Sequence, residues 1–570
     1  MDPLIGAKKS TVLSDLLKCK SLARIIKSQR TLPWPCPPTA DLPEKDVTDT
    51  LVDCYLRSVE TIYRILHVPS FKRDYETMWI DAKPRTAFLV QLKLVLAIGA
   101  TTYDEHFSLR TSAVRWVYEA QTWISEPEFK SRLGVEYLQT NILLLLARET
   151  AGVAGDSIWV SAGELLRRAM SMGLHRDPAY LPAMSVLFSE TRRRLWSTVL
   201  EIALQSCLAS GGPPLVSFED FDTEIPGNFD DDQLMGENPL AKPEDCFTDA
   251  SISIALRKTL PPRLSVAKLL NDVGAKGTYD DILRLDAELQ ASHKALGFAL
   301  QRYKTSDGPS PSRFSLDAVN FILLRYLLSL HAPFFVLALN NNAAYSHSRK
   351  VVVQTSLKLW CAAHPTSSVA AGQEDCDAAT LGKKEDLELF ASFGMGFYRI
   401  STMLAFLFIA VEIEARIEEE GGWGPIPLQP YLLSLLDEAK TWGFDSVKSG
   451  ETGVKGYMVI CVVAANVKGR MRQLGIDGLK KTLLKALEDS VQTCLPILER
   501  MAFPDPACGE MDDLLQISLD SEFQLMPDWN FIVSSTKRVL GLSIFSRFYY
   551  YNRLRILYST LVFRGQRIVR

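Results

Sequence analysis

The amino-acid sequence predicts an all-α protein, on three observations. Apolar residues recur every three to four positions through most of residues 45–500, which is the spacing of a helix face buried against a core. Runs with strand-like alternation are few, and no Asn-Gly or Asp-Gly turn joins two β-branched runs. A hydrophobic content of 47% with 23% charged residues is typical of a globular protein. We therefore expect a large multi-helical array with irregular termini.

The expected helices follow one another with few breaks. The first, 14–26, sets leucine and isoleucine side chains against a basic face. The Pro-rich stretch 31–43 cannot continue this helix because proline lacks the backbone amide donor. Periodic segments after this break predict, among others, the helices 86–101, 135–149, 160–172, 190–210, 316–339 and 387–419.

Changes in composition divide the chain into four predicted regions. Gly, Pro, Ser and acidic residues mark the expected loops 211–243, 304–312, 364–386 and 421–430 inside the helical part. The predicted regions are a basic helix with a Pro-rich linker (1–44), a helical domain (45–500), an acidic-hydrophobic segment (501–531) and a basic aromatic tail (532–570).

Charge and cysteine usage exclude several classes of protein. A net charge of −4 and a pI near 6.1 give no overall attraction to nucleic acid. The 10 cysteines are spaced irregularly, unlike the framework of a disulfide-stabilised protein. The first residues lack the apolar core of a signal peptide. The longest apolar runs, 321–339 and 402–411, are interrupted or too short to span a bilayer. We expect a soluble intracellular protein without membrane association.

Three short motifs resemble enzyme sites but lack the partners that the chemistry needs. His-Arg-Asp at 175–177 matches a kinase catalytic loop, which requires an asparagine where this chain has Pro182. The glycines of 394–396 are followed by Arg399, where a dinucleotide fingerprint needs glycine. The aspartates 230–232 resemble the magnesium-binding run of an all-α terpene cyclase without its partner motif, and we interpret them as a solvated loop. We therefore expect no enzyme activity and no catalytic, cofactor-binding or metal-binding residues.

A tri-arginine block opens one predicted helix, whose apolar stripe from Leu195 to Cys207 has the spacing of a buried face. Cationic residues at a helix N-terminus oppose the helix dipole, so such a block is best tolerated beside carboxylates. Acidic residues follow shortly downstream. We predict an internal salt-bridge latch, with a phosphate-binding patch as the alternative. Its candidate residues are Arg192, Arg193, Arg194, Glu219, Asp220 and Asp222.

The segment 510–531 holds six acidic residues and no basic one, interleaved with large apolar residues. Such a segment can stay disordered and still offer apolar anchors to a coactivator groove. An acidic surface helix or a linker is the equal alternative. The candidate activation anchors are Leu514, Leu515, Phe523, Trp529 and Phe531.

Beyond Asp528 the chain has no acidic residue and becomes basic and aromatic. A nucleic-acid-binding or nuclear-targeting tail would have this composition. A mistranslated or alternatively spliced end without selected function is the alternative for the same residues.

Several motifs in a fixed order resemble one known family. They are a helix that leads to a His-x-Pro-x-Phe turn (His67, Pro69 and Phe71) within 52–79, Gly-Leu-His-Arg-Asp at 173–177, Arg-Arg-Leu-Trp at 193–196, Gly-Gly-Pro-Pro at 211–214 with Ile-Pro at 225–226, and a helix ending in a His-x-Pro-Phe turn within 326–335. Together they resemble the regulatory middle domain of fungal zinc-cluster (Zn(II)2Cys6) transcription factors, over roughly residues 45–500.

The resemblance implies a nuclear, α-helical regulator of gene expression, frequently of biosynthetic or nutrient pathways. The partners it implies are a transcriptional coactivator or a DNA-binding partner protein, a small-molecule effector and a second copy in a homodimer. The alternative from a different class is an α-helical enzyme of secondary metabolism with an unrecognised site.

The zinc cluster of that family does not occur in this sequence. Such a cluster needs six thiolates in two Cys-x2-Cys-x6-Cys halves, whereas Cys19, Cys36 and Cys54 are 17 and 18 residues apart and no Cys-x-x-Cys occurs. We therefore expect no cofactor in this chain, with zinc expected only where an N-terminal cluster exists outside it. We also expect no sequence-specific DNA binding by this chain alone. A truncated gene model, a natural isoform and a regulator that works through a partner are the open explanations.

Overall fold

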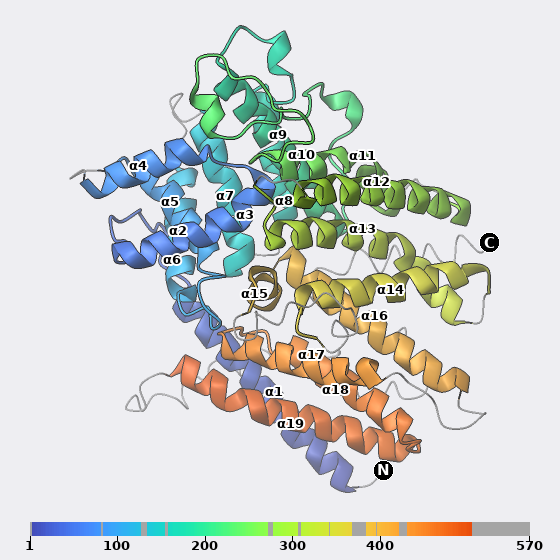
Figure 1. The fold of residues 1–570 in the computed structure, drawn as a ribbon. Coiled ribbons are helices and arrows are strands. Elements are labelled where there is room, and N and C mark those ends of the chain that lie inside the picture. The colour runs from blue at the N-terminus through green and yellow to red at the C-terminus, as the bar shows by residue number, and fades with distance from the viewer. Residues whose placement is uncertain are drawn as a thin grey trace. The chain divides into compact units, whose positions relative to one another are not determined.

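The structure is a computed structural model that describes residues 3–80, 84–126, 134–153, 158–271, 277–305, 309–340, 343–367, 384–394, 396–420 and 430–503. Within these ranges the chain forms helices α1 to α19, a few 3-10 helices and loops, and no β-strand (Figure 1). The predicted all-α class is confirmed. The described residues divide into a first unit (3–33, 364–367 and 403–503) and a second unit (34–363 and 384–402).

In the first unit, the first described helix of the chain packs against the last one. Helix α1 lies beside α19, and α19 also packs on α18, which packs on α17 (Figure 1). The side chains of Lys18 and Glu499 form an ion pair of 2.7 Å along this contact. The helices of this unit are α1 (Pro3–Arg30), the later part of α16 (Phe397–Glu420), α17 (Pro430–Lys448), α18 (Lys455–Met471) and α19 (Ile476–Ala502).

Helix α1 follows the amphipathic pattern that its sequence predicts and extends beyond the predicted range 14–26 at both ends. Its buried side chains recur every three or four residues, so they form one stripe. The stripe packs into a core with α17–α19. The basic helix predicted within residues 1–44 is thus a core helix of this unit. The division of the chain into four regions remains a prediction. The buried α1 residues are Val12, Leu16, Cys19, Leu22 and Ile26.

The second unit contains most of the helices. They are α2 (Lys45–Arg57), α3 (Val59–Tyr63), α4 (Val68–Ile80), α5 (Thr86–Gly99), α6 (Arg110–Ser125), α7 (Val135–Ala151), α8 (Ile158–Ser171), α9 (Val186–Ser210), α10 (Ser251–Lys258), α11 (Leu260–Asn271), α12 (Tyr279–Thr305), α13 (Arg313–Leu339), α14 (Ser346–Ala363), α15 (Asp386–Phe393) and the start of α16, with the 3-10 helices η3 (Pro178–Tyr180), η4 (Phe218–Asp220), η5 (Asp232–Met235) and η6 (Ala343–Tyr345).

Helix α9 is a central element of the second unit, and its ends follow from local sequence. The hydroxyl of Ser185 caps the first turn by accepting the backbone N–H of Phe188 at 3.2 Å. At the other end Gly211 adopts a left-handed conformation, with φ at 71°, and its N–H bonds to the carbonyl of Cys207. Between these caps Trp196 is fully buried. α9 therefore begins four residues before the predicted helix 190–210 and ends where predicted.

Helix α13 is the one described helix whose length and composition would suit a membrane span. Inside the protein, 67% of its most apolar stretch is buried, as in the core helix of a globular protein. Pro333 lies within α13, so the helix does not end at the His-x-Pro-Phe motif, as the sequence resemblance predicted, but continues to Leu339.

The predicted continuous helix 387–419 is wrong, because the chain breaks at Gly394 between α15 and α16. Gly394 leaves the helical conformation (φ −65°, ψ 148°), and its N–H closes α15 on the carbonyl of Phe390. Glu149 of α7 then accepts the backbone N–H of Phe397, at 2.9 Å, in the first turn of α16. Glycine is a poor helix former, and a side chain from a neighbouring helix stabilises the new helix start.

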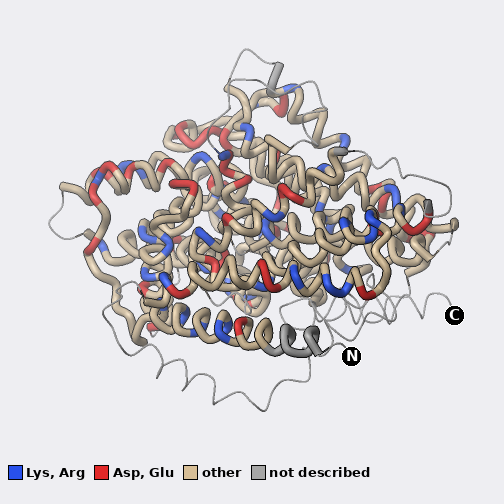
Figure 2. Tube along the Cα trace, turned by 90° about the horizontal axis from the view of Figure 1, so that it is seen from below, with Lys and Arg blue, Asp and Glu red and all other residues tan. Residues whose placement is uncertain are grey.

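Acidic and basic residues are interspersed along the described helices (Figure 2). This distribution agrees with the small net charge of the chain, −4.

Candidate functional site

The tri-arginine block does not open its helix, because α9 begins at Val186 and Arg192 already lies in its second turn. The helix-dipole argument for the block is therefore wrong, since the dipole acts mainly within the first turn. The arginines need hydrogen-bond partners because they are buried: Arg192 and Arg194 are 7% and 4% exposed. A buried guanidinium is costly unless oxygen atoms surround it.

Arg193 pairs with a carboxylate from the turn before α9. Its Nε and Nη2 atoms donate to the two oxygens of Asp177 at 2.9 and 2.7 Å, and its Nη1 donates to Glu190 at 2.7 Å. Asp177 also accepts the N–H groups of Ala179 and Glu224. Burial alone would raise the pKa of Asp177, but Arg193 and these donors lower it to about 2. Asp177 is therefore held as a carboxylate.

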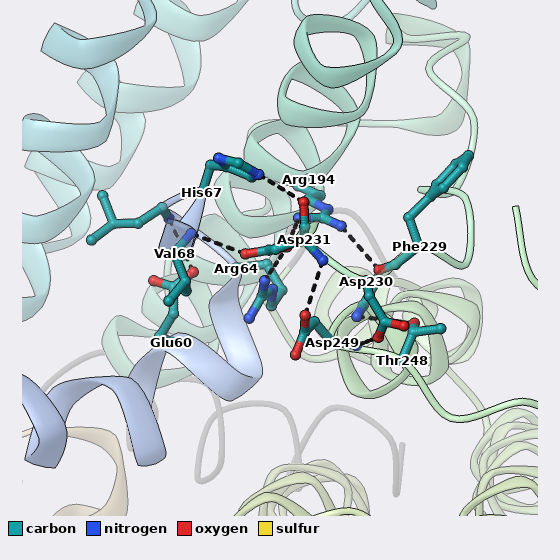
Figure 3. A network of polar contacts seen from close by, with 12 residues as sticks. Glu60, Arg64, His67, Val68, Arg194, Phe229, Asp230, Asp231, Thr248 and Asp249 are labelled. Carbon is teal, nitrogen blue, oxygen red and sulfur yellow. Dashed lines mark hydrogen bonds and ion pairs between the residues drawn. The ribbon is translucent and has the colours of Figure 1, made fainter. Parts of the chain in front are cut away.

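Arg194 meets a second arginine on one buried carboxylate, that of Asp231 (Figure 3). The Oδ1 atom of Asp231 lies 2.6 Å from Nη1 of Arg194 and 2.5 Å from Nη2 of Arg64. Arg64 directly follows α3 and itself adopts a left-handed backbone conformation, with φ at 42°. Burial alone would raise the pKa of Asp231, but the two guanidinium groups lower it to about 2. One carboxylate thus serves two arginines from distant parts of the chain.

The Oδ2 atom and the backbone carbonyl of Asp231 bind the start of α4 (Figure 3). Its Oδ2 accepts the backbone N–H of Val68 at 3.0 Å, and its carbonyl accepts the Nε2 hydrogen of His67 at 2.9 Å. The other ring nitrogen of His67 lies 2.8 Å from the hydroxyl of Ser70. The histidine of the His-x-Pro-x-Phe motif therefore docks on the acidic run. Because Asp231 is only 2% exposed, our interpretation of 230–232 as a solvated loop is wrong for this residue.

Arg192 has backbone partners instead of a carboxylate. Its Nη2 atom donates to the carbonyls of Gly173, at 2.6 Å, and Met172, at 3.3 Å. Burial lowers the pKa of Arg192. The left-handed conformation of Gly173 (φ 74°) shapes the turn that presents these carbonyls.

The three carboxylates predicted as latch partners have other contacts in the structure. Glu219 and Asp220 accept hydrogen bonds from Ser217, the first from its hydroxyl and the second from its N–H. Asp222 pairs with Arg176 at 3.1 Å. Glu219 and Asp220 both lie in the 3-10 helix η4 and are exposed at the surface. The partners of the arginines are a different set, and we call the whole set the arginine core: Arg64, Arg192, Arg193, Arg194, Asp177, Glu190 and Asp231.

The arginine core connects three segments to α9. Arg192 and Arg193 hold the turn 172–177, Arg194 holds the loop 227–231, and Asp231 in turn holds Arg64 and the start of α4. These contacts make the core a structural joint, because buried ion pairs fix one arrangement of the segments that carry them. The sequence did not predict Arg64, Asp177, Glu190 and Asp231 as residues of the arginine core. Asp177 and Arg193 each lie in a motif of the family resemblance, and an ion pair between these two motifs could have been proposed from the sequence.

A second buried ion pair lies further along α9. Arg263 of α11 is fully buried, and its two terminal nitrogens donate to the two oxygens of Glu201 at 2.7 and 2.8 Å. Gln205 also donates to Glu201, and Tyr63 donates to Gln205. This chain of contacts fastens α11 and α3 to the same face of α9.

The candidate activation anchors Leu514, Leu515, Phe523, Trp529 and Phe531 lie outside the described residues. The same holds for the basic tail 532–570.

Comparison with known proteins identifies the class. Residues 52–256, which contain the arginine core, match the family described as the fungal specific transcription factor domain. The chain thus carries the domain of a family of fungal transcription factors, and Zn2Cys6 proteins are among its relatives. The predicted resemblance is confirmed. The family is described as one of transcription factors, which favours the predicted regulator over the alternative of an enzyme of secondary metabolism.

Three curated relatives show how far the similarity extends. Transcription factor lepE of Aspergillus flavus is 34% identical over 85% of this chain and 59% of its own length. Transcription factor opdR of Penicillium oxalicum is 32% identical over 86% of this chain and 64% of its own length. The aspyridones cluster regulator apdR of Emericella nidulans is 30% identical over 47% of this chain and 37% of its own length. The chain thus spans about three fifths of the length of the first two. No solved structure matches the chain.

Proposed function

We propose that this chain acts in the nucleus as a transcriptional regulator of a biosynthetic gene set, most specifically a secondary-metabolite gene cluster. The observation that carries the proposal is the fungal specific transcription factor domain at residues 52–256. Relatives support the finer statement, since one of them is named as the regulator of the aspyridones cluster. The described residues act as the regulatory body.

DNA contact in this proposal comes from outside the chain. Zinc would be bound by a cluster in an N-terminal segment or in a partner protein, because the sequence has no Cys-x-x-Cys. A transcriptional coactivator, a DNA-binding partner protein and a second copy of the chain are the partners we propose. A small-molecule effector would act by binding one packing of the helical body better than another.

The arginine core is the element we assign to regulation. It holds the segments 172–177, 227–231 and 64–68 on α9 through buried charges, so its loss would release several segments together. We infer that the closed core restrains the output segment 501–531. An effector that favours the open arrangement would then raise transcription.

Deletion and overexpression of the gene test the function. We expect transcripts of one contiguous biosynthetic gene set to fall at least tenfold on deletion and to rise on overexpression, measured by RNA sequencing. Unchanged transcripts in both strains would contradict a regulatory role. Loss of the metabolite with unchanged transcripts would instead indicate an enzyme.

A reporter assay tests the output segment. Residues 505–531 fused to a foreign DNA-binding domain should activate a reporter, and Trp529→Ala should reduce that activation severalfold because it removes an apolar anchor. Ser521→Ala in the same segment is the control and should leave activation unchanged. A silent fusion would remove the activation segment from the proposal.

The restraint needs a separate assay on the whole chain. Fused to the same DNA-binding domain, the Arg193→Ala variant should drive the reporter more strongly than the wild-type chain at equal protein level. Arg176→Ala is the matched control, because the ion pair that the structure describes for Arg176 lies at the surface, where its side chain is 54% exposed. Equal reporter activity for all three proteins would show that the arginine core does not restrain output.

A further inference from the structure

Three potential metal ligands converge from three helices of the second unit, beyond the matched domain. Asp286 lies on α12, His331 on α13 and His347 at the start of α14. Their ligand atoms all lie within 4.8 Å of one another. In the sequence they are far apart, which is why no metal-ligand spacing was visible there.

The buried histidine already has the orientation of a ligand. His331 is fully buried, and its Nδ1 atom lies 2.9 Å from the hydroxyl of Ser348. Its Nε2 atom has no hydrogen-bond partner within the described part of the chain and lies 3.4 Å from Oδ1 of Asp286. A second-sphere hydrogen bond at one ring nitrogen is how proteins aim the other nitrogen at a metal.

The hydrogen bond to Ser348 can run in either direction. The Ser348 hydroxyl also lies 3.0 Å from the hydroxyl of Tyr279, and either of these two atoms could be the donor. When Ser348 donates to Tyr279, it can accept the Nδ1 hydrogen of His331. The Nε2 lone pair of His331 is then free to bind a cation beside Asp286.

The second histidine gives the site access to solvent. The Nε2 atom of His347 lies 3.0 Å from Oδ2 of Asp286, and the His347 side chain is 48% exposed. Gln290 donates to Oδ1 of Asp286 at 2.6 Å and so orients the carboxylate. An ion can therefore enter at His347 and meet one buried nitrogen and one oriented carboxylate.

An aromatic trio lies close to the cluster in sequence, on α12, α13 and the 3-10 helix η6. The rings of Tyr279, Phe334 and Tyr345 lie 4.8 to 5.3 Å apart, centroid to centroid. Phe334 is one helical turn after His331, and Tyr345 is two residues before His347. An apolar shell of this kind fixes ligand-bearing elements and limits solvent access.

We propose that Asp286, His331 and His347 form a binding site for one divalent transition-metal ion, of which zinc fits best. Two ligand atoms at zinc bonds of about 2.1 Å in tetrahedral geometry are about 3.4 Å apart, the separation seen between His331 and Asp286. Two imidazole nitrogens and one carboxylate oxygen suit zinc better than magnesium or calcium, which prefer all-oxygen sites. Water at the exposed side completes the fourth position.

The ion would link α12, α13 and α14 through one ligand from each helix. A ligand that binds only the folded state raises its stability by mass action. The site goes beyond the proposed function and does not depend on it, since transcription is not part of its test.

Zinc titration of the full-length chain tests the site. The protein is purified without a polyhistidine tag, stripped with a chelator and titrated with zinc chloride against a colorimetric competitor. We expect the wild-type chain to bind one more zinc equivalent than His347→Ala and to show a higher unfolding temperature with zinc. His106→Ala, which removes an exposed histidine elsewhere, should behave as the wild type. Bound cobalt should give a tetrahedral visible spectrum that His347→Ala loses.

His347→Ala separates loss of zinc binding from loss of folding. The His347 side chain is half exposed, so its removal should leave the fold intact, as circular dichroism would confirm. Asp286→Asn, which keeps the side-chain shape, is the second variant. Equal zinc stoichiometry in wild type and His347→Ala would overturn the proposal. A wild-type chain that binds no zinc would also overturn it.

Discussion

Arg193 and Asp177 form a two-point ion pair, with nitrogen–oxygen distances of 2.9 and 2.7 Å. Asp177 is the aspartate of the kinase-like motif 175–177, and the structure gives it a structural role. It caps η3 through the N–H of Ala179, accepts the N–H of Glu224 and neutralises an arginine of α9. A motif that resembled a catalytic loop is thus a connection between the turn before α9 and the loop after it.

Replacing Arg193 should destabilise the second unit markedly. In Arg193→Ala the Asp177 carboxylate, which is 1% exposed, loses its charge partner, and leaving a buried charge uncompensated costs about 3 kcal/mol. Arg193→Lys should recover only part of this loss, because lysine cannot form the two-point contact. Urea unfolding followed by circular dichroism measures the effect.

The surface pair next to it is the control for this experiment. Arg176 and Asp222 pair at 3.1 Å with side chains 54% and 36% exposed, and such pairs contribute about 0 to 1 kcal/mol. Arg176→Ala should therefore shift the unfolding midpoint very little. An equal shift for both variants would contradict the assignment of Arg193 to a buried joint.

Asp231 and its neighbour Asp232 offer a matched pair of substitutions. Asp231→Asn keeps the side-chain shape but removes the charge shared by Arg64 and Arg194, so we expect a loss of about 3 kcal/mol or more. Asp232→Asn changes an exposed residue and should cost less than about 0.5 kcal/mol. Thermal unfolding of the two variants side by side measures the difference. Similar unfolding temperatures would show that Asp231 does not support the joint.

The helices could be predicted from sequence because periodicity and caps are local signals. Helix α9 ends at the predicted residue, where Gly211 supplies the left-handed cap. The break at Gly394 could not be predicted from periodicity, since the apolar spacing continues across it while the next helix start depends on Glu149 of α7. Backbone capping by a distant side chain leaves no mark in the local pattern.

The partners of the arginines show the same limit at the site. Sequence proximity favoured Glu219, Asp220 and Asp222, all within one loop after α9. The structure instead brings Asp177 from the preceding turn and Asp231 from the far end of the loop. Which carboxylate reaches a buried arginine is decided by the packing of whole helices, and neither charge spacing nor burial pattern encodes it.

The pair Glu201 and Arg263 should behave as a coupled unit. Arg263→Met alone leaves a buried carboxylate unpaired, and Glu201→Gln alone leaves a buried guanidinium with weaker acceptors, so each should cost about 3 kcal/mol. The double variant should cost clearly less than the sum, with an interaction energy of about 1 to 3 kcal/mol. Urea unfolding of the four proteins measures it. Additive losses would show that the two residues are not coupled.

Stability should fall on both sides of a maximum near pH 5. The pKa values of Asp177 and Asp231 lie at about 2 in the folded chain against an ordinary value of 3.8, because their arginines outweigh burial. The folded state therefore binds fewer protons than the unfolded one between these values. This stabilisation is present above about pH 4 and is lost as pH falls toward 2, about 2 kcal/mol for each carboxyl.

Glu60 acts in the opposite direction at higher pH. Its side chain is fully buried, and this burial raises its pKa from 4.5 to about 7 although Arg64 and Tyr55 pull the pKa down. Because the folded state holds the proton longer, the stabilisation is full below about pH 4.5 and is lost as pH rises through 7, about 3 kcal/mol in all.

The substitution Glu60→Gln isolates the contribution of Glu60 to the pH dependence of the unfolding free energy. Glutamine does not titrate, so the unfolding free energy of Glu60→Gln should change less between pH 5 and 7.5 than that of the wild type, whatever its absolute value. Glu244→Gln is the control, because Glu244 is 84% exposed and its ion pair within the described residues, with Lys258, lies at the surface, so it should keep the wild-type slope. Urea unfolding at half-unit steps of pH gives the three curves. Parallel curves for all three proteins would mean that Glu60 is ionised throughout this range and that Arg64 outweighs its burial.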